Sequence, residues 1–355
     1  MKTIFLLITL SLIFTFISCE DSKEDIPSQK PQDEEEVTAK DDHYNLPVIF
    51  HVFYKDHTDP LQYVSQSRLA EILGAVNNLY KDAAQSVDMN LTFTLATNDE
   101  DGKTLSNPGV EYIQWTESYP IDCDAFMEDN SGKYAKFLWD PNQYINVMIY
   151  NFTQDDDNFI TLGISHLPFT TTDSNYLAGL NETEYSYLEK DNLSFAYCAS
   201  INSLCINEQS SKEEYNTTDV TVTLAHELGH YLGLHHVFSE SKEGGCEDTD
   251  YCEDTPSYDK TIYDTNYDYI SKNDEANYTF SYLVQRESCD GTKFTSHNIM
   301  DYSVSNSDQF TADQRVRIRH VLNYSPLIPG PKKGQNRSRA TAPDGPLDLP
   351  ILTLK

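Results

Sequence analysis

The segment 226–236, which reads His-Glu-Leu-Gly-His-Tyr-Leu-Gly-Leu-His-His, constrains this chain more than any other feature. His226 and His230 are four residues apart, so on a helix both imidazoles project from one face, one turn apart. Gly233 can adopt the left-handed conformation that ends a helix, after which the chain can turn and bring His236 back to the same point. Three neutral imidazoles that leave one position open are typical of a catalytic zinc site rather than a structural one.

Two neighbours of these histidines refine the interpretation. Glu227 can reach a water molecule held between the imidazoles and a substrate carbonyl, which suits a general base. His235 adjoins His236, but the spacing favours His236 as the ligand and leaves the role of His235 open. Two histidines at helical spacing can also be ordinary core or surface residues, and the added Gly233 and His236 argue against that alternative.

A second motif lies at residues 297–302, which read His-Asn-Ile-Met-Asp-Tyr. A methionine beneath three imidazoles offers an apolar, polarizable floor without binding the metal. The extended histidine pattern followed by such a turn is the mark of the metzincins. We therefore interpret Met300 as the Met-turn residue, and Tyr302 as a phenol that can stabilise a tetrahedral oxyanion or weakly bind zinc.

Within the metzincins, the chain resembles the pappalysin-type family and specifically a bacterial, Bacteroidetes-like lipoprotein branch. The resemblance covers roughly residues 46–320 and is carried, besides the two motifs, by segments 46–52, 236–238, 250–256 and 310–315. It implies an α+β metzincin catalytic domain. A twisted mixed sheet and two long helices would form the upper subdomain, and a loop-rich lower subdomain would contain a C-terminal helix.

The hydrophobic pattern predicts elements that agree with this fold. Alternating or β-rich segments predict strands at 48–54, 91–95 and 144–150, and helical spacing predicts helices at 67–84, 219–232 and 312–323. Thr217, Thr218 or Asp219 is expected to cap the helix 219–232. Segment 162–168 resembles the family's strand along the upper rim of the cleft, where an extended substrate can pair through backbone hydrogen bonds.

The N-terminal residues predict export. The apolar run 4–17 follows Lys2 and is too short for an ordinary membrane span, so it is interpreted as the core of a signal peptide. Residues 16–19, Phe-Ile-Ser-Cys, resemble a bacterial lipobox, in which Cys19 is lipidated. Phe16 departs from the usual leucine, so cleavage by a general signal peptidase is the alternative.

The predicted organisation therefore has four parts. Residues 1–18 form the signal peptide and residues 19–45 an acidic, flexible tether that cannot bury a core. Residues 46–325 form the catalytic domain, with the upper subdomain ending at about 233 and the lower one spanning 234–325. The Pro-rich tail 326–355 is expected to be a strap or disordered. No folded pro-domain is expected, because only the tether precedes the first strand.

The charge restricts the partners. The chain has 25 basic and 57 acidic residues, a net charge of −32, which repels nucleic acid and anionic membrane surfaces. Membrane contact is therefore expected only through the lipid on Cys19, in a bacterial outer membrane and outside the cytoplasm. The acidic run after Cys19 resembles signals for cell-surface exposure. The expected partner is a peptide or protein substrate, and the oligomeric state is not predicted.

The six cysteines after Cys19 fit an oxidising compartment and allow fifteen sets of three disulfides. Proximity favours a pair between Cys198 and Cys205. The resemblance implies a bridge between Cys246 and Cys289. Elimination then leaves Cys123 with Cys252.

A calcium ion is a further expectation from the resemblance. Asp250 and Thr255 fall where pappalysin-like relatives bind a structural Ca²⁺, and oxygen ligands suit such a hard cation. The alternative is an ordinary polar loop capped by side-chain hydrogen bonds.

The resemblance implies a secreted endopeptidase in which Zn²⁺ activates water and Glu227 acts as general base. One alternative is a non-catalytic surface-binding lipoprotein of the same fold, against which the intact Glu227 and histidines argue. The other is a zinc amidase that acts on a non-peptide substrate, whereas the rim strand favours peptides.

Overall fold

The computed structural model describes residues 42–81, 86–154, 159–211, 214–241, 244–302, 304–333 and 342–354. The residues from Asp42 onward form one compact unit. The predicted signal peptide, Cys19 and nearly all of the tether lie outside the described residues. In the part of the chain that the structure describes, no helix has the length and apolarity needed to cross a membrane.

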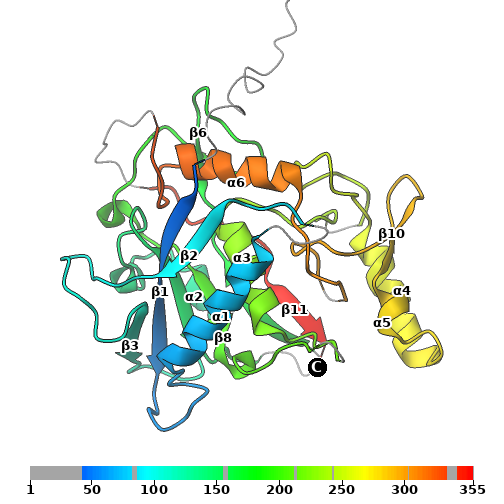
Figure 1. Ribbon diagram of the computed structural model, residues 1–355, viewed down its shortest axis with the longest axis horizontal. Coiled ribbons are helices and arrows are strands. Elements are labelled where there is room, and N and C mark those ends of the chain that lie inside the picture. The colour runs from blue at the N-terminus through cyan, green and yellow to red at the C-terminus, as the bar shows by residue number, and fades with distance from the viewer. Residues whose placement is uncertain are drawn as a thin grey trace, which may run out of the picture. The chain divides into compact units, whose positions relative to one another are not determined.

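A mixed sheet forms the centre of this unit (Figure 1). Its strands are β1 (Tyr44–Tyr54), β2 (Leu91–Leu95), β3 (Val110–Gln114), β4 (Ile145–Tyr150), β5 (Phe159–Ser165), β8 (Ala199–Asn202) and β11 (Ile351–Leu354). They follow the order β11-β5-β8-β4-β1-β2, and β3 pairs with the second half of β1. Strands β2, β1, β4 and β8 are parallel, whereas β5 and β11 are antiparallel to their neighbours.

Strand β1 is the longest strand of the sheet, and most of it is buried. Its apolar run from Val48 to Phe53, broken only by His51, is typical of a parallel strand covered on both faces. The strand begins at Tyr44, so the predicted tether boundary at residue 45 is wrong by two residues. The reason is that Tyr44 and Asn45 already pair with the start of β2.

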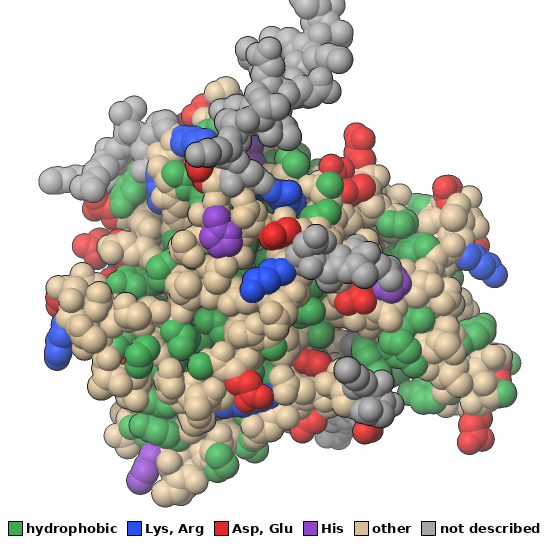
Figure 2. Space-filling view, viewed as in Figure 1, with side chains coloured by type: hydrophobic (Ala, Val, Ile, Leu, Met, Phe, Trp, Pro, Cys, Tyr) green, Lys and Arg blue, Asp and Glu red, His purple; other side chains and the backbone are tan. Residues whose placement is uncertain are grey.

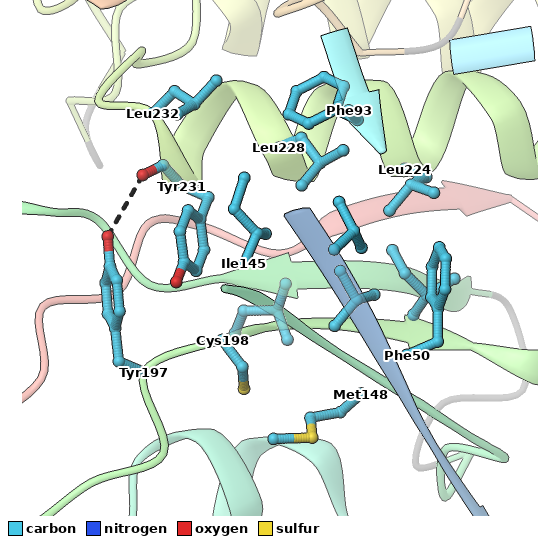
Figure 3. Close-up of a cluster of buried hydrophobic side chains, with 14 of the residues drawn as sticks. Phe50, Phe93, Ile145, Met148, Tyr197, Cys198, Leu224, Leu228, Tyr231 and Leu232 are labelled. Carbon is cyan, nitrogen blue, oxygen red and sulfur yellow. Dashed lines mark hydrogen bonds between the residues drawn. The ribbon is translucent and has the colours of Figure 1, made fainter. Parts of the chain in front are cut away.

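Two long helices pack beside the sheet, as predicted: α1 (Gln66–Leu79) and α3 (Val220–Tyr231). Of the three candidate caps for α3, Asp219 is the one that accepts hydrogen bonds from the first turn. Leu224 and Leu228 extend from α3 toward the buried side chains of the sheet (Figure 3). Helix α1 ends before the predicted residue 84, because the Tyr80 ring is buried between Phe93 and Phe310.

The lower half contains more helix than the sequence predicted. Helix α6 (Ala312–Tyr324) was predicted, but α4 (Lys260–Asn273) and α5 (Phe280–Leu283) replace an expected loop. Figure 1 shows α4 and α5 at one side of the unit, away from the sheet. Ile270 is the one buried residue of α4, and the other residues on its inner face are the partly buried tyrosines Tyr263 and Tyr267, which form a weak helical signal.

Short elements complete the chain. They are α2 (Cys123–Met127), the 3₁₀ turns Ala135–Phe137, Lys190–Asn192 and Ser203–Cys205, and the two-stranded pairs β6 (Phe169–Thr171) with β7 (Asn181–Thr183) and β9 (Gln285–Glu287) with β10 (Lys293–Thr295). Acidic side chains are dispersed over the face shown in Figure 2 rather than gathered over one element.

One of the three predicted disulfides is present. Cys246 and Cys289 are bonded, with a Cα–Cα separation of 5.5 Å. The two other predicted pairings are wrong, because Cys198, Cys205, Cys123 and Cys252 are free and buried. Cys198 and Cys123 belong to the main core, whereas Cys205 packs in a separate cluster and the Cys252 thiol donates to the carbonyl of Asp250.

Candidate active site

Three histidine side chains converge at the end of α3. The helix carries His226 and His230, and Gly233, with φ of 91°, ends it and returns the chain so that His236 joins them. The three Nε2 atoms lie 3.0 to 3.1 Å from one another, and all three side chains are fully buried. His235 does not contribute to this group.

The hydrogen bonds of the rings show that these nitrogens can bind a metal. Each Nδ1 faces an oxygen, namely Ile299 O at 2.8 Å for His226, Leu234 O at 2.9 Å for His230 and Glu240 Oε1 at 2.6 Å for His236. A proton on each Nδ1 leaves a lone pair on each Nε2. Three converging lone pairs repel unless a cation lies between them. The distances between the three Nε2 atoms are close to the roughly 3.3 Å expected between ligand nitrogens of tetrahedral zinc with Zn–N bonds of about 2.0 to 2.1 Å. The residues therefore fit the metal.

Glu240 is a supporting residue that the sequence reasoning missed. Its carboxylate orients the ring of His236, and Phe238 stacks on the same ring with centroids 4.7 Å apart. Carboxylates that accept from a ligand imidazole fix its orientation and increase its basicity. The sequence signal that could have identified Glu240 is an acidic residue four positions after the last histidine, His236.

Glu227 lies fully buried beside the histidines, and neither carboxylate oxygen has a hydrogen-bond partner among the described residues. The side chain packs on the backbone of β5. A methyl group added at Gly163 would lie 2.8 Å from Glu227 Cγ and Oε1. Burial raises the pKa of Glu227 to about 8. A buried carboxylate without a structural partner is suited to accept a proton.

Replacing Gly163 by Ala is therefore expected to displace Glu227 and to reduce catalysis without unfolding the protein. Displacements of about 1 Å can cost on the order of 100-fold in rate. Turnover and zinc content should be measured together, since the metal ligands do not contact Gly163. Gly74→Ala is the matched control, because nothing lies within 4 Å of the added methyl group. Unchanged turnover in Gly163→Ala would contradict this placement of Glu227.

The Met-turn lies directly beneath α3, the helix that carries His226 and His230. Met300 is fully buried, and its sulfur packs against Gly229 of α3. Asn298 exchanges two amide hydrogen bonds with Gln314 of α6, which anchors the turn to that helix. The turn therefore has the position that the sequence predicted, with Ile299 supplying the carbonyl that orients His226.

A buried ion pair also supports the turn. Arg286 lies 3.3 Å from Asp301, and both side chains are almost completely buried. The phenol of Tyr258 donates to Asp301 at 2.5 Å. Sequence reasoning missed Arg286, because its partner is distant in the chain and nothing in the local pattern indicates the pair.

Replacing Arg286 by Met is expected to destabilise the protein by about 3 to 5 kcal/mol, because Asp301 would remain buried without a compensating charge. Urea unfolding measures the change. Lys272→Met is the control, since Lys272 and Asp268 form an exposed pair whose loss should change stability little. Equal effects of the two substitutions would contradict the role given to Arg286.

The predicted calcium residues form a compact polar loop. Thr255 Oγ1 donates to Asp250 Oδ2 at 2.6 Å, and the amide of Cys252 donates to Asp250 Oδ1 at 2.9 Å. Both carboxylate oxygens thus have protein donors, which agrees with the polar-loop alternative. Calcium binding stays a prediction.

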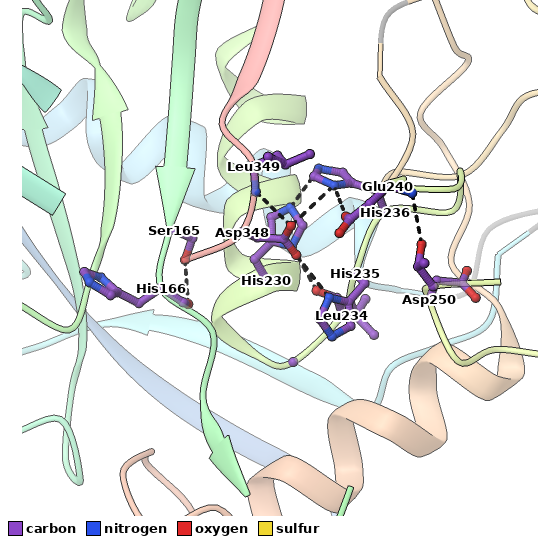
Figure 4. Close-up of polar contacts among 12 residues, drawn as sticks. Ser165, His166, His230, Leu234, His235, His236, Glu240, Asp250, Asp348 and Leu349 are labelled. Atoms are coloured by element: carbon purple, nitrogen blue, oxygen red, sulfur yellow. Dashed lines mark hydrogen bonds and ion pairs between the residues drawn. The ribbon is translucent and has the colours of Figure 1, made fainter. Parts of the chain in front are cut away.

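The C-terminal segment contributes side chains that the sequence reasoning did not place in the site. Asp348 Oδ2 lies 3.1 Å from His230 Nδ1 and 3.2 Å from His235 Nδ1 (Figure 4). Tyr302, the predicted oxyanion residue, lies against His236 and donates to Pro350 O at 2.8 Å. Together with Glu240, Asp348 and His235 form a second group of metal-binding residue types.

Comparisons with known proteins agree with this geometry. The model of the peptidase family described as pregnancy-associated plasma protein-A matches residues 197–323, which include the histidines and the Met-turn. Extracellular metalloproteases of Arthroderma benhamiae and Trichophyton verrucosum are each 39% identical to the chain over 98 residues. These residues make up 27% of this chain and 29% of each relative, so the chain spans under a third of these curated relatives.

Solved structures show the same fold. Tannerella forsythia mature mirolysin in complex with a cleaved peptide superposes on 78% of this chain and 90% of its own, with a TM-score of 0.52 and 20% identity. A promirolysin mutant from the same organism covers 81% and 85%, with a TM-score of 0.52 and 18% identity. The predicted α+β metzincin fold is thereby confirmed. Residues 197–323, which contain the histidines and the Met-turn, are thus similar to the pappalysin-type peptidase family.

Proposed function

We propose that this protein is a secreted, zinc-dependent endopeptidase. The observation that carries the proposal is the convergence of three imidazole Nε2 atoms beside the carboxylate of Glu227, which has no hydrogen-bond partner in the described part of the chain. His226, His230 and His236 would hold the zinc. The metalloprotease names of the curated relatives support the same activity.

The chain's own residues have distinct tasks in this proposal. A zinc ion held by the histidines would polarise the scissile carbonyl and lower the pKa of a water molecule. Glu227 takes a proton from the attacking water on its carboxylate and then donates it to the nitrogen of the leaving amine. The Tyr302 phenol donates to the carbonyl oxygen of the substrate. The backbone of β5 aligns the substrate as an added antiparallel strand.

The proposal is tested by incubating the zinc-loaded protein with a proteome-derived peptide library and analysing the products by mass spectrometry. Internal peptide bonds should be cleaved, the cleavage should stop with a chelator, and added zinc should restore it. Binding without cleavage would indicate the non-catalytic lipoprotein. Cleavage restricted to amides of glycan or cell-wall substrates would indicate the amidase.

Anchoring by lipid at Cys19 belongs to the same proposal. Its support is the apolar run before a lipobox-like Phe-Ile-Ser-Cys sequence, followed by the acidic segment. Mass spectrometry of the purified mature protein tests it. A diacylglyceryl group on Cys19 is the expected result, and a free N-terminus beyond Cys19 would contradict it.

A further inference from the structure

We propose that residues 346–354 form an intramolecular pseudo-substrate that occupies the peptide-binding cleft, so that the described structure is a latent form of the enzyme. This inference rests on the proposed function. It assigns a regulatory role to part of the tail 326–355, which the sequence predicts to be a strap or disordered.

The backbone of this segment lies where an extended peptide would bind. Strand β5 pairs with β8 on one side, and without β11 its other side would be a free edge. The segment runs antiparallel along that edge, from the hydrogen bond between Leu167 N and Pro346 O at 2.9 Å to the pairing of Leu354 with Phe159. A free edge of this kind binds extended peptides by adding a strand. The tail takes these pairing positions.

The segment also reaches both predicted catalytic side chains. Pro350 O accepts the hydrogen bond from the Tyr302 phenol at 2.8 Å. The next residue, Ile351, pairs with Gly163, against which Glu227 packs. The peptide group between Pro350 and Ile351 therefore lies between the Tyr302 phenol and the Glu227 carboxylate, the two side chains that would act on a scissile peptide bond.

Asp348 holds the segment in place. Its side chain is only 3% exposed and lies within 3.6 Å of Nδ1 on His230, His235 and His236. Figure 4 shows that it extends from the C-terminal segment, before β11, into this group of rings. Among the apolar residues of the segment, Leu349 and Leu352 are 46% and 38% exposed, whereas Ile351 is buried beside Leu162 and Leu347 packs against the main core. The tail is thus held by the carboxylate of Asp348, by backbone pairing and by the packing of Leu347 and Ile351.

The burial of the site indicates that the tail blocks access of a substrate to the histidines and Glu227. His226, His230, His236 and Glu227 are all 0% exposed. An endopeptidase must admit an extended polypeptide to these atoms, and it cannot do so while the tail occupies the cleft. Activity is then reduced in proportion to the fraction of molecules whose tail is displaced.

The test compares the full chain with a variant that lacks residues 346–355 but keeps the backbone anchors at Ala342 and Gly345. Two quantities are measured: kcat/KM on library-derived peptides, and hydrogen exchange of the amides in residues 159–167. Deletion is expected to raise kcat/KM at least about tenfold. It should also expose those amides to exchange. A synthetic peptide of sequence 346–355 should restore their protection and inhibit competitively.

A second variant covers the case in which the deletion does not fold. Asp348→Ala in the full chain should speed both exchange and cleavage. Asp344→Ala is its control, since Asp344 is exposed and precedes the paired residues. Unchanged exchange and cleavage in Asp348→Ala, or a loss of zinc and of activity, would overturn the proposal. Such a loss would make the tail a structural strand and Asp348 a positioning residue for the histidines.

The readouts separate the two hypotheses. If exchange and peptide binding behave as expected but neither form cleaves any peptide, the proposed function fails and the occupancy of the cleft stands. If the deletion variant cleaves no faster than the full chain and the synthetic peptide does not bind, the latent form is excluded and the protease assignment stands.

Discussion

Replacing Glu227 by Gln is expected to abolish peptide hydrolysis while the fold and the zinc content remain unchanged. Glutamine has nearly the same shape but cannot take a proton from water. General bases contribute about 10² to 10⁴ to a rate, and the loss here should reach the upper part of that range. Because neither oxygen of Glu227 has a hydrogen-bond partner among the described residues, the substitution breaks no structural contact.

The measurement is kcat/KM of the Gln variant and of the parent, each with its zinc content determined and its thermal unfolding recorded. Equal zinc and an equal or higher unfolding temperature would show that the loss is chemical. An isosteric control is Glu111→Gln, because Glu111 contacts His51 and Trp139 in another part of the sheet. A Glu227→Gln variant with near-parental turnover would refute the role of this carboxylate.

Replacing His236 by Ala should reduce zinc affinity far more than the same change at His235. His236 contributes an Nε2 to the group of three, whereas His235 contacts Asp348 and the ring of Tyr251. Loss of a supporting carboxylate typically costs about 10- to 100-fold in metal affinity, and loss of a ligand should cost more. The expected order of affinities is therefore parent, then Glu240→Gln, then His236→Ala.

Competition against a chromophoric chelator gives these affinities directly. His235→Ala should stay close to the parent. The adjacent histidines have the same intrinsic chemistry, so the difference between the two variants measures the geometry of the turn after Gly233. Equal losses at both positions, or a larger loss at His235, would contradict the ligand set.

Helix α3 with its two histidines and the Met-turn could be predicted because their signals are local. Helical spacing alone places His226 above His230, and Gly233 alone permits the turn that brings back His236. Strands β1 and β4 could be predicted for the same reason, since buried parallel strands are nearly continuous apolar runs, and β2 because its apolar residues alternate with threonine.

What could not be predicted depends on contacts between distant parts of the chain. Asp348 is an ordinary acidic residue in a Pro-rich tail until β11 pairs with β5 and places it beside the histidines. The structural role of Arg286 likewise becomes apparent only when the fold buries Asp301 next to it. The error with Cys198 and Cys205 has the same origin, because seven residues of separation do not decide whether two side chains point into the same cluster.

The central claim is that His226, His230 and His236 together hold a metal ion. Anomalous diffraction at the zinc edge, from crystals grown with stoichiometric zinc, tests it most directly. We predict a single strong peak within bonding distance of the three Nε2 atoms. The account is contradicted if no peak lies there, or if the zinc lies instead among His235, Glu240 and Asp348, the other group of metal-binding residue types in the described part of the chain.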